Sequence, residues 1–372
     1  MKIGVPTEVK DQEFRVGLTP ASVHALATAG HEVVLQQGCG LGSGIPDAEY
    51  EAAGGRLLTD AESVFAWAEL VIKVKEPVEA EVGCLRSGQI LFTFLHLAPL
   101  PVLTQALLHR EVCGVAYETI ADEHGHLPLL TPMSEIAGRM AVLMGSFYLQ
   151  RNFGGRGALL AGVPGVPPGD VVVVGGGVVG LNAAKIALGL GARVAVVDTS
   201  LDRLRFFDDL FHGKVTTLAS NHHNLLGAMK RADVLVGAVL IPGSSAPKVI
   251  TRKMLKVMKH RSVVVDVSVD QGGCLETTHP TTHSDPVYEV DGVIHYCVAN
   301  MPGAVPRTST FALNNATLPY ILSLANLGLE GAMSADPGFA RGVNTYRGRL
   351  TCAPVAESQG IEYADISELL GG

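Results

Sequence analysis

The sequence predicts an α/β protein with two doubly wound parallel-sheet domains, joined by long helices, and an active site in the cleft between the domains. Three observations predict this fold. Apolar runs of strand length alternate with helical patterns in both halves of the chain, which is typical of βαβ units. A glycine-rich turn directly follows a run of valines near the middle of the chain. The length of 372 residues exceeds what one ordinary core holds, which favours two domains.

The first block of the chain, residues 1–128, alternates strands and helices. We expect strands over residues 2–6, 31–37, 69–75, 89–96 and 112–119. Thr19 and Pro20 are typical of an N-cap and a first helical turn, and the helix that they open is expected to end near Gly30. Further helices are expected over 60–68 and 101–110. Strands that are joined by helices in this way pair in parallel and are buried on both faces.

The second block begins with a long amphipathic segment over residues 131–152, which predicts a connecting helix. A loop rich in glycine and proline follows over 154–170 and is expected to mark a boundary. Strands are then expected over 171–174, 193–198, 233–239, 262–267 and 294–298, and a helix over 306–324. Because the first block has no closing segment of its own, we expect the C-terminal residues to fold back onto it. The predicted domains are therefore 1–128 with 306–372, and 129–305.

The composition excludes several classes of protein. Hydrophobic residues make up 47% and charged residues 17%, which excludes intrinsic disorder and favours buried subunit interfaces, hence a homo-oligomer. The net charge of −8 argues against a nucleic-acid partner. The N-terminus lacks the apolar region of a signal peptide, and prolines interrupt the uncharged segment 87–109, which argues against a membrane span. Six cysteines without a CxxC pair indicate a reducing compartment, so we expect a cytoplasmic protein.

The segment 170–198 carries a dinucleotide-binding fingerprint. Gly175, Gly177 and Gly180 fit the pattern GxGxxG between a valine strand and a helix. The helix N-terminus that they open is suited to a pyrophosphate. The next strand ends in Asp198, where a carboxylate can bind ribose hydroxyls and disfavours a 2′-phosphate. The sequence therefore predicts an NAD-binding, Rossmann-like domain over 129–305, although Arg203 and Arg205 keep NADP open, and a glycine-rich turn of an unrelated α/β fold is the alternative.

Four polar residues stand at the predicted carboxyl ends of strands, where parallel sheets bind ligands. Lys75 and His96 lie in the first block, and Asp270 and Asn300 in the second. His96 suits acid–base catalysis near neutral pH, Lys75 could fix a carboxylate or polarise a carbonyl, and Asp270 could face a nicotinamide. The alternatives are a structural histidine, a solvated lysine and a turn-forming aspartate.

Arg15 could bind a carboxylate substrate through two parallel hydrogen bonds. An exposed loop arginine is the alternative. Metal sites are not expected, because Pro280 lies between His279 and His283 and the other histidine pairs suit surface loops. The chain also lacks a GxSxG motif and a P-loop.

Long segments of the chain resemble the family of L-alanine dehydrogenases and NAD-binding subunits of proton-translocating transhydrogenases. The resemblance covers essentially the whole length. It includes MKIGVPTEVKDQEFRVGLTP at the start, TPMSEIAGRMA at 131–141, GGGVVGLNAAKIA at 175–187, and the long segment 270–320 that begins DQGGCLETTHPTTHSDP. It implies reversible oxidative deamination of L-alanine with NAD⁺ and water, giving pyruvate, ammonium and NADH, by a cytoplasmic homohexamer.

The resemblance also implies roles for individual residues. Arg15 and Lys75 hold the substrate, and His96 and Asp270 are the acid–base residues. The implied cofactor contacts are Ser134, Gly175, Gly177, Val178, Val179, Gly180, Asp198, Arg203, Ser220, Val239, Leu240, Val267, Ser268, Val269, Asp270, His279, Val298, Ala299, Asn300 and Met301.

The chain departs from the family pattern at two places. Position 279 is His where many relatives carry Arg, which weakens one expected cofactor contact. Ser323 and Leu327 stand where some relatives bind a divalent ion, so no such site is expected. Two other functions remain open: another amino- or imino-acid oxidoreductase of this superfamily, such as a lysine-pathway dehydrogenase, and a dinucleotide sensor without turnover. The presence of complete catalytic candidates argues against the sensor and against a transhydrogenase subunit.

Overall fold

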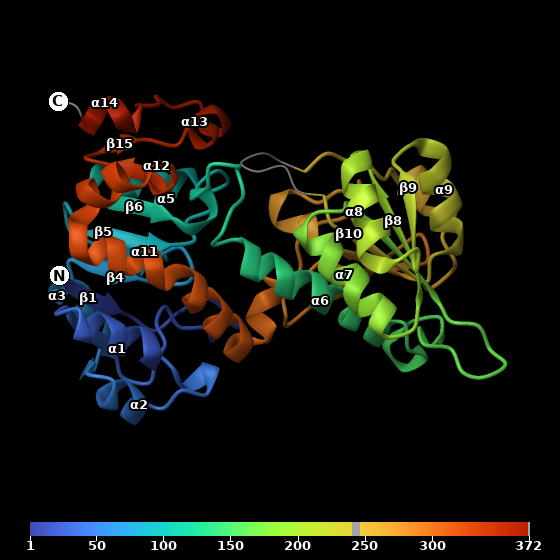
Figure 1. The fold of residues 1–372 in the computed structure, drawn as a ribbon, viewed down its shortest axis with the longest axis horizontal. Coiled ribbons are helices and arrows are strands. Elements are labelled where there is room, and N and C mark those ends of the chain that lie inside the picture. Colours follow the sequence, from blue (N-terminus) through green and yellow to red (C-terminus); the bar gives the residue numbers. More distant parts are fainter. Residues whose placement is uncertain (240–245, 371–372) are drawn as a thin grey trace. The chain divides into compact units, whose positions relative to one another are not determined.

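The computed structural model describes residues 1–239 and 246–370 and divides into two compact units (Figure 1). Unit 1 comprises Met1–Met133 and Val305–Gly372, and unit 2 comprises Ser134–Ala304. The first change of unit falls within helix α6 (Thr131–Tyr148). None of the helices in the described part of the chain combines the length and the apolar character that a membrane span requires.

Unit 1 is built around an eight-stranded sheet in the order β15-β14-β6-β5-β4-β1-β2-β3. Its strands are β1 (Lys2–Val5), β2 (Glu32–Gln36), β3 (Arg56–Leu58), β4 (Leu70–Ile72), β5 (Ile90–Thr93), β6 (Cys113–Ala116), β14 (Val343–Tyr346) and β15 (Arg349–Leu350). Strands β1 to β6 pair in parallel, as the sequence predicts. Strand β14 pairs antiparallel with both β6 and β15, so the sheet is mixed at this edge.

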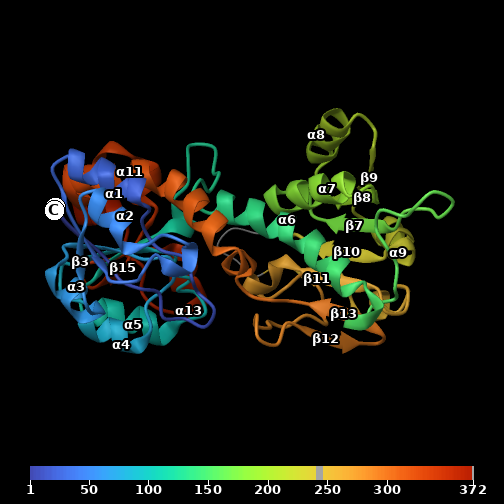
Figure 2. The same cartoon turned by 90° about the horizontal axis from the view of Figure 1, so that it is seen from below.

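Helices cover both faces of this sheet (Figure 2). Helices α1 (Pro20–Thr28) and α11 (Pro306–Ala335) lie on one face. Helices α3 (Ala61–Trp67), α4 (Glu79–Cys84) and α5 (Pro101–His109) lie on the other. The remaining helices of the unit are α2 (Asp47–Ala52), α12 (Pro337–Ala340), α13 (Ala353–Gln359) and α14 (Ile366–Leu370).

Local sequence signals explain where several elements begin and end. The Thr19 hydroxyl accepts a hydrogen bond from the Ser22 backbone N–H and so caps α1, as its sequence predicts. Helix α11 is longer than expected, and its helical geometry is interrupted at Gly328, whose φ is 71°. The C-terminal residues pack on unit 1, because β14 pairs with β6 and Val355 of α13 joins the core beside Leu107.

Unit 2 has a seven-stranded sheet in the order β12-β13-β11-β10-β7-β8-β9. Its strands are β7 (Asp170–Val174), β8 (Arg193–Asp198), β9 (Val215–Ala219), β10 (Val234–Gly237), β11 (Val263–Asp266), β12 (Val287–Val290) and β13 (Val293–Tyr296). Counted along the chain, the six parallel strands follow the order 3-2-1-4-5-6 of a dinucleotide-binding sheet. Among the described strands of this unit, the pair β12–β13 is antiparallel and the other pairs are parallel.

Alternating valines of β7 supply both cores of unit 2. Val171 and Val173 pack with α6, α7 (Val178–Gly189) and α8 (Leu201–Phe211). Val172 and Val174 pack on the opposite face, with α9 (His222–Arg231) and α10 (Arg252–Leu255). A strand that is apolar on both faces must be covered on both, which explains why the run of four valines predicts a central strand.

Four expectations about local structure, for three strands and one loop, are wrong in detail. The strands expected over 69–75 and 89–96 end earlier, at Ile72 and Thr93. Residues 117–119 form a 3₁₀ turn rather than the end of β6. The loop over 154–169 lies inside unit 2 and is not a boundary between units. Glycines and prolines do end the preceding helical region there, but the chain continues into the same core through Leu160.

A buried ion triad lies beside the end of β4. The Lys73 ammonium lies 3.1 Å from a Glu8 carboxylate oxygen and 2.6 Å from a Glu81 carboxylate oxygen. The Lys73 side chain is fully buried, and the two glutamates are nearly so. Burial opposes the charge of Lys73, but Glu8 and Glu81 outweigh it and raise the pKa of Lys73. The lysine therefore stays charged at neutral pH.

Lys73→Met leaves two carboxylates buried without their cation, so we expect the free energy of unfolding to fall by about 3–5 kcal/mol. Urea unfolding followed by circular dichroism measures the change. Arg205→Met serves as the control, because Arg205 pairs with Asp202 at an exposed site. We expect its urea midpoint of unfolding to equal that of the wild type. Equal midpoints for wild type and Lys73→Met would contradict the structural role of the triad.

Candidate functional site

The carboxyl ends of the parallel strands in unit 1 gather the first set of candidate residues. Strands β1, β4, β5 and β6 are neighbours in the sheet and run in one direction. The loops that follow them carry Glu8, Lys75, His96 and Glu118 respectively. Residues that lie far apart in the sequence are thereby brought to one edge of the sheet.

Arg15 lies in the loop between β1 and α1, and it is 2% exposed. Its Nε and one terminal nitrogen each donate to a different Glu13 carboxylate oxygen at 2.6 Å. The other terminal nitrogen lies 3.2 Å from Met133 Sδ. The alternative of an exposed loop arginine is therefore wrong. Glu13 holds the guanidinium in one orientation.

Lys75 stands three residues after the end of β4, in a segment that the Glu8 carboxylate holds. Glu8 accepts hydrogen bonds from the backbone N–H groups of Val74 at 2.6 Å and Lys75 at 3.4 Å. Tyr117 donates its hydroxyl to the Lys73 carbonyl in the same segment. The backbone of Lys75 is thus fixed, while its side chain is half-buried.

His96 stands three residues after the end of β5 and has a left-handed backbone, with φ of 47°. The Glu118 carboxylate supports this conformation by accepting the His96 N–H at 2.6 Å and the Leu95 N–H at 3.2 Å. The imidazole stacks on Phe94 with ring centroids 5.7 Å apart. Its Nδ1 lies 3.6 Å from an oxygen of Glu76. The sequence analysis missed Glu118 and Glu76, which lie two residues after β6 and four residues after β4.

The fingerprint turn of unit 2 follows β7 directly and shows why glycine is needed there. Gly175 has φ of 105°, and a Cβ on it would lie 2.4 Å from the Ala238 carbonyl oxygen. A Cβ on Gly180 would lie 1.9 Å from the Gly175 oxygen. A Cβ on Gly177 would meet no described atom within 4 Å. Gly175 and Gly180 therefore close the turn, and Gly177 leaves open space at the N-terminus of α7.

Asp198 and Arg203 brace this turn from β8 and α8. One Asp198 carboxylate oxygen accepts the Gly176 N–H at 2.5 Å, and the other accepts the Ser200 N–H at 2.7 Å. Arg203 donates to the Gly176 carbonyl from two nitrogens, at 2.9 and 2.7 Å. Its guanidinium also lies 4.6 Å from the centroid of the Phe206 ring. The two residues therefore bind the two backbone polar groups of Gly176, its N–H and its carbonyl.

Asp266, which the sequence analysis missed, organises the segment after β11. Its buried carboxylate accepts the backbone N–H groups of Ser268 at 3.0 Å and Cys274 at 2.9 Å, and the Thr278 hydroxyl at 2.7 Å. Burial outweighs these hydrogen bonds and raises the pKa of Asp266. The sequence does contain a signal for this residue. Asp266 ends the strand VVVD in the same way as Asp198 ends the strand with VVD. Asp270 lies exposed in the 3₁₀ turn Val267–Gln271 that Asp266 caps.

Most other predicted cofactor residues follow carboxyl ends of strands in unit 2. Ser220 follows β9, Val239 follows β10, and Asn300 follows β13 with φ of 65°. The same edge carries Val267, Ser268 and Val269 after β11, and Val298, Ala299 and Met301 after β13. Val178 and Val179 open α7, and Ser134 lies on α6. Leu240 lies outside the described residues.

His279 is exposed and stacks on Tyr288 with ring centroids 3.9 Å apart. Its backbone N–H donates to the Tyr288 hydroxyl at 3.0 Å. Within residues 1–239 and 246–370, no group of three or more histidine, cysteine or acidic side chains is arranged to hold a metal ion.

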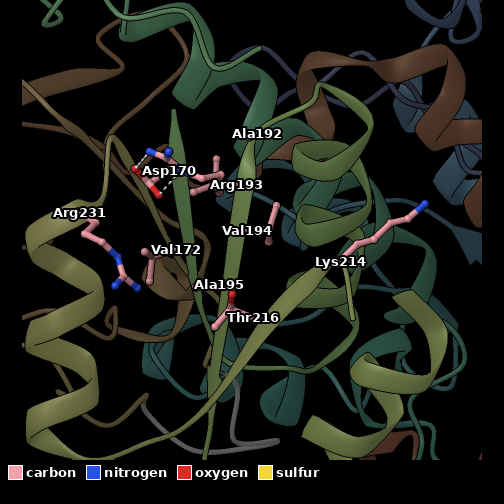
Figure 3. Close-up of a pocket in the computed structure, with 10 residues that line it drawn as sticks. Asp170, Val172, Ala192, Arg193, Val194, Ala195, Lys214, Thr216 and Arg231 are labelled. Carbon is pink, nitrogen blue, oxygen red and sulfur yellow. Dashed lines mark hydrogen bonds and ion pairs between the residues drawn. The ribbon is translucent and has the colours of Figure 1, made fainter. Parts of the chain in front are cut away.

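A surface cavity of about 650 Å³ lies in unit 2 toward the amino ends of its strands, away from the carboxyl ends that carry the predicted cofactor residues (Figure 3). Asp170 and Arg193, at the amino ends of β7 and β8, line it and form an ion pair of 2.6 Å. Lys214 and Arg231 contribute further positive charge to the lining. None of the residues that line this cavity is a predicted cofactor contact. The cavity is therefore separate from the fingerprint turn.

Two family models match the chain: the N-terminal domain of alanine dehydrogenase/PNT over residues 4–137, and its C-terminal domain over residues 141–353. An alanine dehydrogenase of Methanococcus maripaludis is 54% identical over 371 residues, covering 100% of both chains. A solved L-alanine dehydrogenase structure matches with a TM-score of 0.93 and 50% identity, over 96% of this chain and 99% of that one. A transhydrogenase structure from Sinorhizobium meliloti matches with a TM-score of 0.82 and 26% identity, over 94% and 100%. The chain therefore belongs to the alanine dehydrogenase/PNT family.

Proposed function

We propose that this protein is an NAD-dependent L-alanine dehydrogenase of the reversible kind. L-alanine, NAD⁺ and water give pyruvate, ammonium, NADH and a proton, and the reverse reaction is reductive amination. The observation that carries the proposal is the presence of two complete residue sets in one chain. Arg15, Lys75 and His96 occupy unit 1, and the fingerprint turn with Asp198 occupies unit 2. The full-length identity of 54% to an enzyme named alanine dehydrogenase supports it.

The fingerprint turn of unit 2 fits a dinucleotide. The open space over Gly177 can take a pyrophosphate, and the backbone N–H groups at the start of α7 suit its charge. Asp198 suits the ribose hydroxyls and favours NAD over NADP. When bound, NAD⁺ supplies the acceptor for the hydride from the alanine Cα. The further proposed contacts are those that the family resemblance implies, with His279 among them.

The substrate is proposed to be held by two cations of unit 1. Arg15 binds its carboxylate, and Glu13 fixes the orientation in which it does so. Lys75 binds the keto or imino group, on a segment that Glu8 keeps rigid. Such orientation lowers a reaction barrier by several kcal/mol. Binding at both ends of the small substrate leaves its Cα in one position.

Two proton-transfer groups complete the proposed reaction. His96 takes a proton from the substrate in deamination and returns it in the reverse direction. Asp270 handles the proton and the water at the carbinolamine stage, and its exposure in the turn Val267–Gln271 suits this role.

We further propose a homo-oligomer, a homohexamer as the family resemblance implies, that works in the cytoplasm. Exposed apolar side chains support an interface. Leu143 and Phe147 of α6 are 50% and 38% exposed, and Phe153 is 40% exposed. The rings of Phe147 and Phe153 stack at 4.0 Å. Covering these side chains with a second copy would remove apolar surface from water.

The reaction itself is tested by mixing the purified protein with L-alanine and NAD⁺ at mildly alkaline pH, where release of a proton favours deamination. We expect NADH to form, measured by its absorbance, and to form selectively with L-alanine over D-alanine and L-lysine. NAD⁺ should be strongly preferred to NADP⁺. A folded sample that binds NADH but does not reduce NAD⁺ with any amino acid would point instead to a dinucleotide sensor.

His96→Ala removes the proposed proton-transfer group, so we expect kcat to fall at least about tenfold while NADH affinity stays unchanged. Steady-state kinetics and NADH fluorescence measure the two quantities. His24→Ala is the matched control, because His24 is exposed on α1 and should tolerate the change without loss of rate. Turnover of His96→Ala at the wild-type rate would remove His96 from the mechanism.

Two alanine substitutions in the fingerprint turn separate ligand binding from folding. Gly177→Ala places a methyl group where no described atom lies, so we expect normal thermal stability and NADH binding weakened at least about tenfold. Gly180→Ala forces its Cβ against the Gly175 carbonyl and should lower stability and binding together. Thermal unfolding and fluorescence titration measure both variants. Wild-type NADH affinity in Gly177→Ala would show that the turn does not receive the pyrophosphate.

A further inference from the structure

Glu76 and His96 contain two buried polar atoms that face each other. Neither Glu76 Oε2 nor His96 Nδ1 has a hydrogen-bond partner within the described part of the chain. The two atoms lie 3.6 Å apart, which is an ion-pair contact but slightly longer than a hydrogen bond. Buried polar atoms without a partner are uncommon and call for an explanation. The two atoms are therefore candidate partners of each other.

The charges around Glu76 keep it ionised. Its second oxygen, Oε1, accepts a hydrogen bond from the Lys10 ammonium. Burial opposes ionisation, but His96, Lys75 and Lys10 outweigh it and lower the pKa of Glu76 to about 2. The side chain is 11% exposed, so water screens its charge only weakly. His96 thus lies beside a carboxylate that is permanently charged near neutral pH.

The orientation of His96 is fixed from its backbone side as well. Glu118 accepts the N–H groups of Leu95 and His96 and so stabilises the left-handed conformation of His96. With Nδ1 directed to Glu76, Nε2 is the nitrogen that remains for a ligand. The histidine side chain is 36% exposed, which leaves part of the ring accessible.

We propose that Glu76 is a positioning residue for His96: it receives the Nδ1–H, fixes this tautomer, and leaves the Nε2 lone pair for the substrate proton. The inference rests on the proposed function of His96. In deamination, a proton passes from the substrate to Nε2, and the N–H bond of the substrate breaks as the imidazolium N–H bond forms. Nδ1 keeps its proton throughout, and the carboxylate stabilises the positive ring. In the reverse direction the same proton returns from Nε2.

Glu76→Gln tests the proposal because the amide keeps the shape and loses the charge. We expect kcat to fall at least about tenfold while the KM for L-alanine and the affinity for NADH change less than about twofold. The other charged groups around the pair are Glu118, which accepts the His96 N–H, and Lys75 and Lys10, which act on residue 76. Loss of the carboxylate disfavours the imidazolium, so the acidic limb of the kcat/KM profile should move to lower pH by about one unit. A structural role alone would not move that limb.

Lys10→Met is the matched control, because it removes the partner of the other Glu76 oxygen and leaves the carboxylate beside His96. We expect its kcat and pH profile to match the wild type. A tenfold loss of kcat in Lys10→Met would overturn the proposal, since packing of the segment would then explain both variants. An unchanged pH profile in Glu76→Gln would overturn it as well.

The double variant Glu76→Gln/His96→Ala separates this inference from the proposed function. If Glu76 acts through His96, the double variant should be no slower than His96→Ala alone. Additive losses would overturn the positioning role. If His96→Ala turns over at the wild-type rate, the role of His96 is refuted. If His96→Ala is slow but Glu76→Gln turns over at the wild-type rate, only the role of Glu76 is refuted.

Discussion

The structure depends on how buried parallel strands end. Where a strand leaves the sheet, its backbone N–H groups lose their ladder partners and must find other acceptors, because unpaired buried donors are costly. In this protein, side-chain carboxylates are the acceptors for these N–H groups. Glu8 accepts the N–H groups that follow β4, Glu118 those that follow β5, and Asp266 those that follow β11. Asp198 does the same for Gly176 after β7. Both units use this arrangement at their carboxyl edges.

These carboxylates bring a second constraint, because a buried negative charge needs compensation. Glu8 receives it from Lys73, whose ammonium also lies against Glu81. Glu13 receives it from Arg15. Glu8 and Glu13, both in the loop after β1, are therefore each paired with a cation, and one of these cations is the candidate residue Arg15. The amino edge of the unit 2 sheet has basic residues too, but there Arg193 pairs with an aspartate at an exposed site.

Local patterns made much of the fold predictable. The valine run of β7, the fingerprint glycines and the cap at Thr19 are set by neighbours in the sequence, so each element followed from its own segment. The antiparallel strand β14 did not, because its partner β6 lies more than 200 residues away. Candidate site residues at strand ends were placed at the expected edges, whereas their carboxylate partners were missed. Glu8 and Val74 are 66 residues apart, and no local pattern links them.

The bracing of the fingerprint turn bears on the choice of cofactor. Asp198 accepts one backbone N–H on each oxygen, and a carboxylate offers about four acceptor positions, so ribose hydroxyls can be added without breaking either bond. Of the two nearby cations that could attract a 2′-phosphate, Arg205 pairs with Asp202, and Arg203 braces the turn. Its guanidinium already donates twice to the Gly176 carbonyl, and turning it outward would remove both bonds from the turn. Binding NAD keeps the existing contacts, whereas binding NADP requires the turn to lose its brace beside an uncompensated carboxylate. This difference supports NAD as the proposed cofactor.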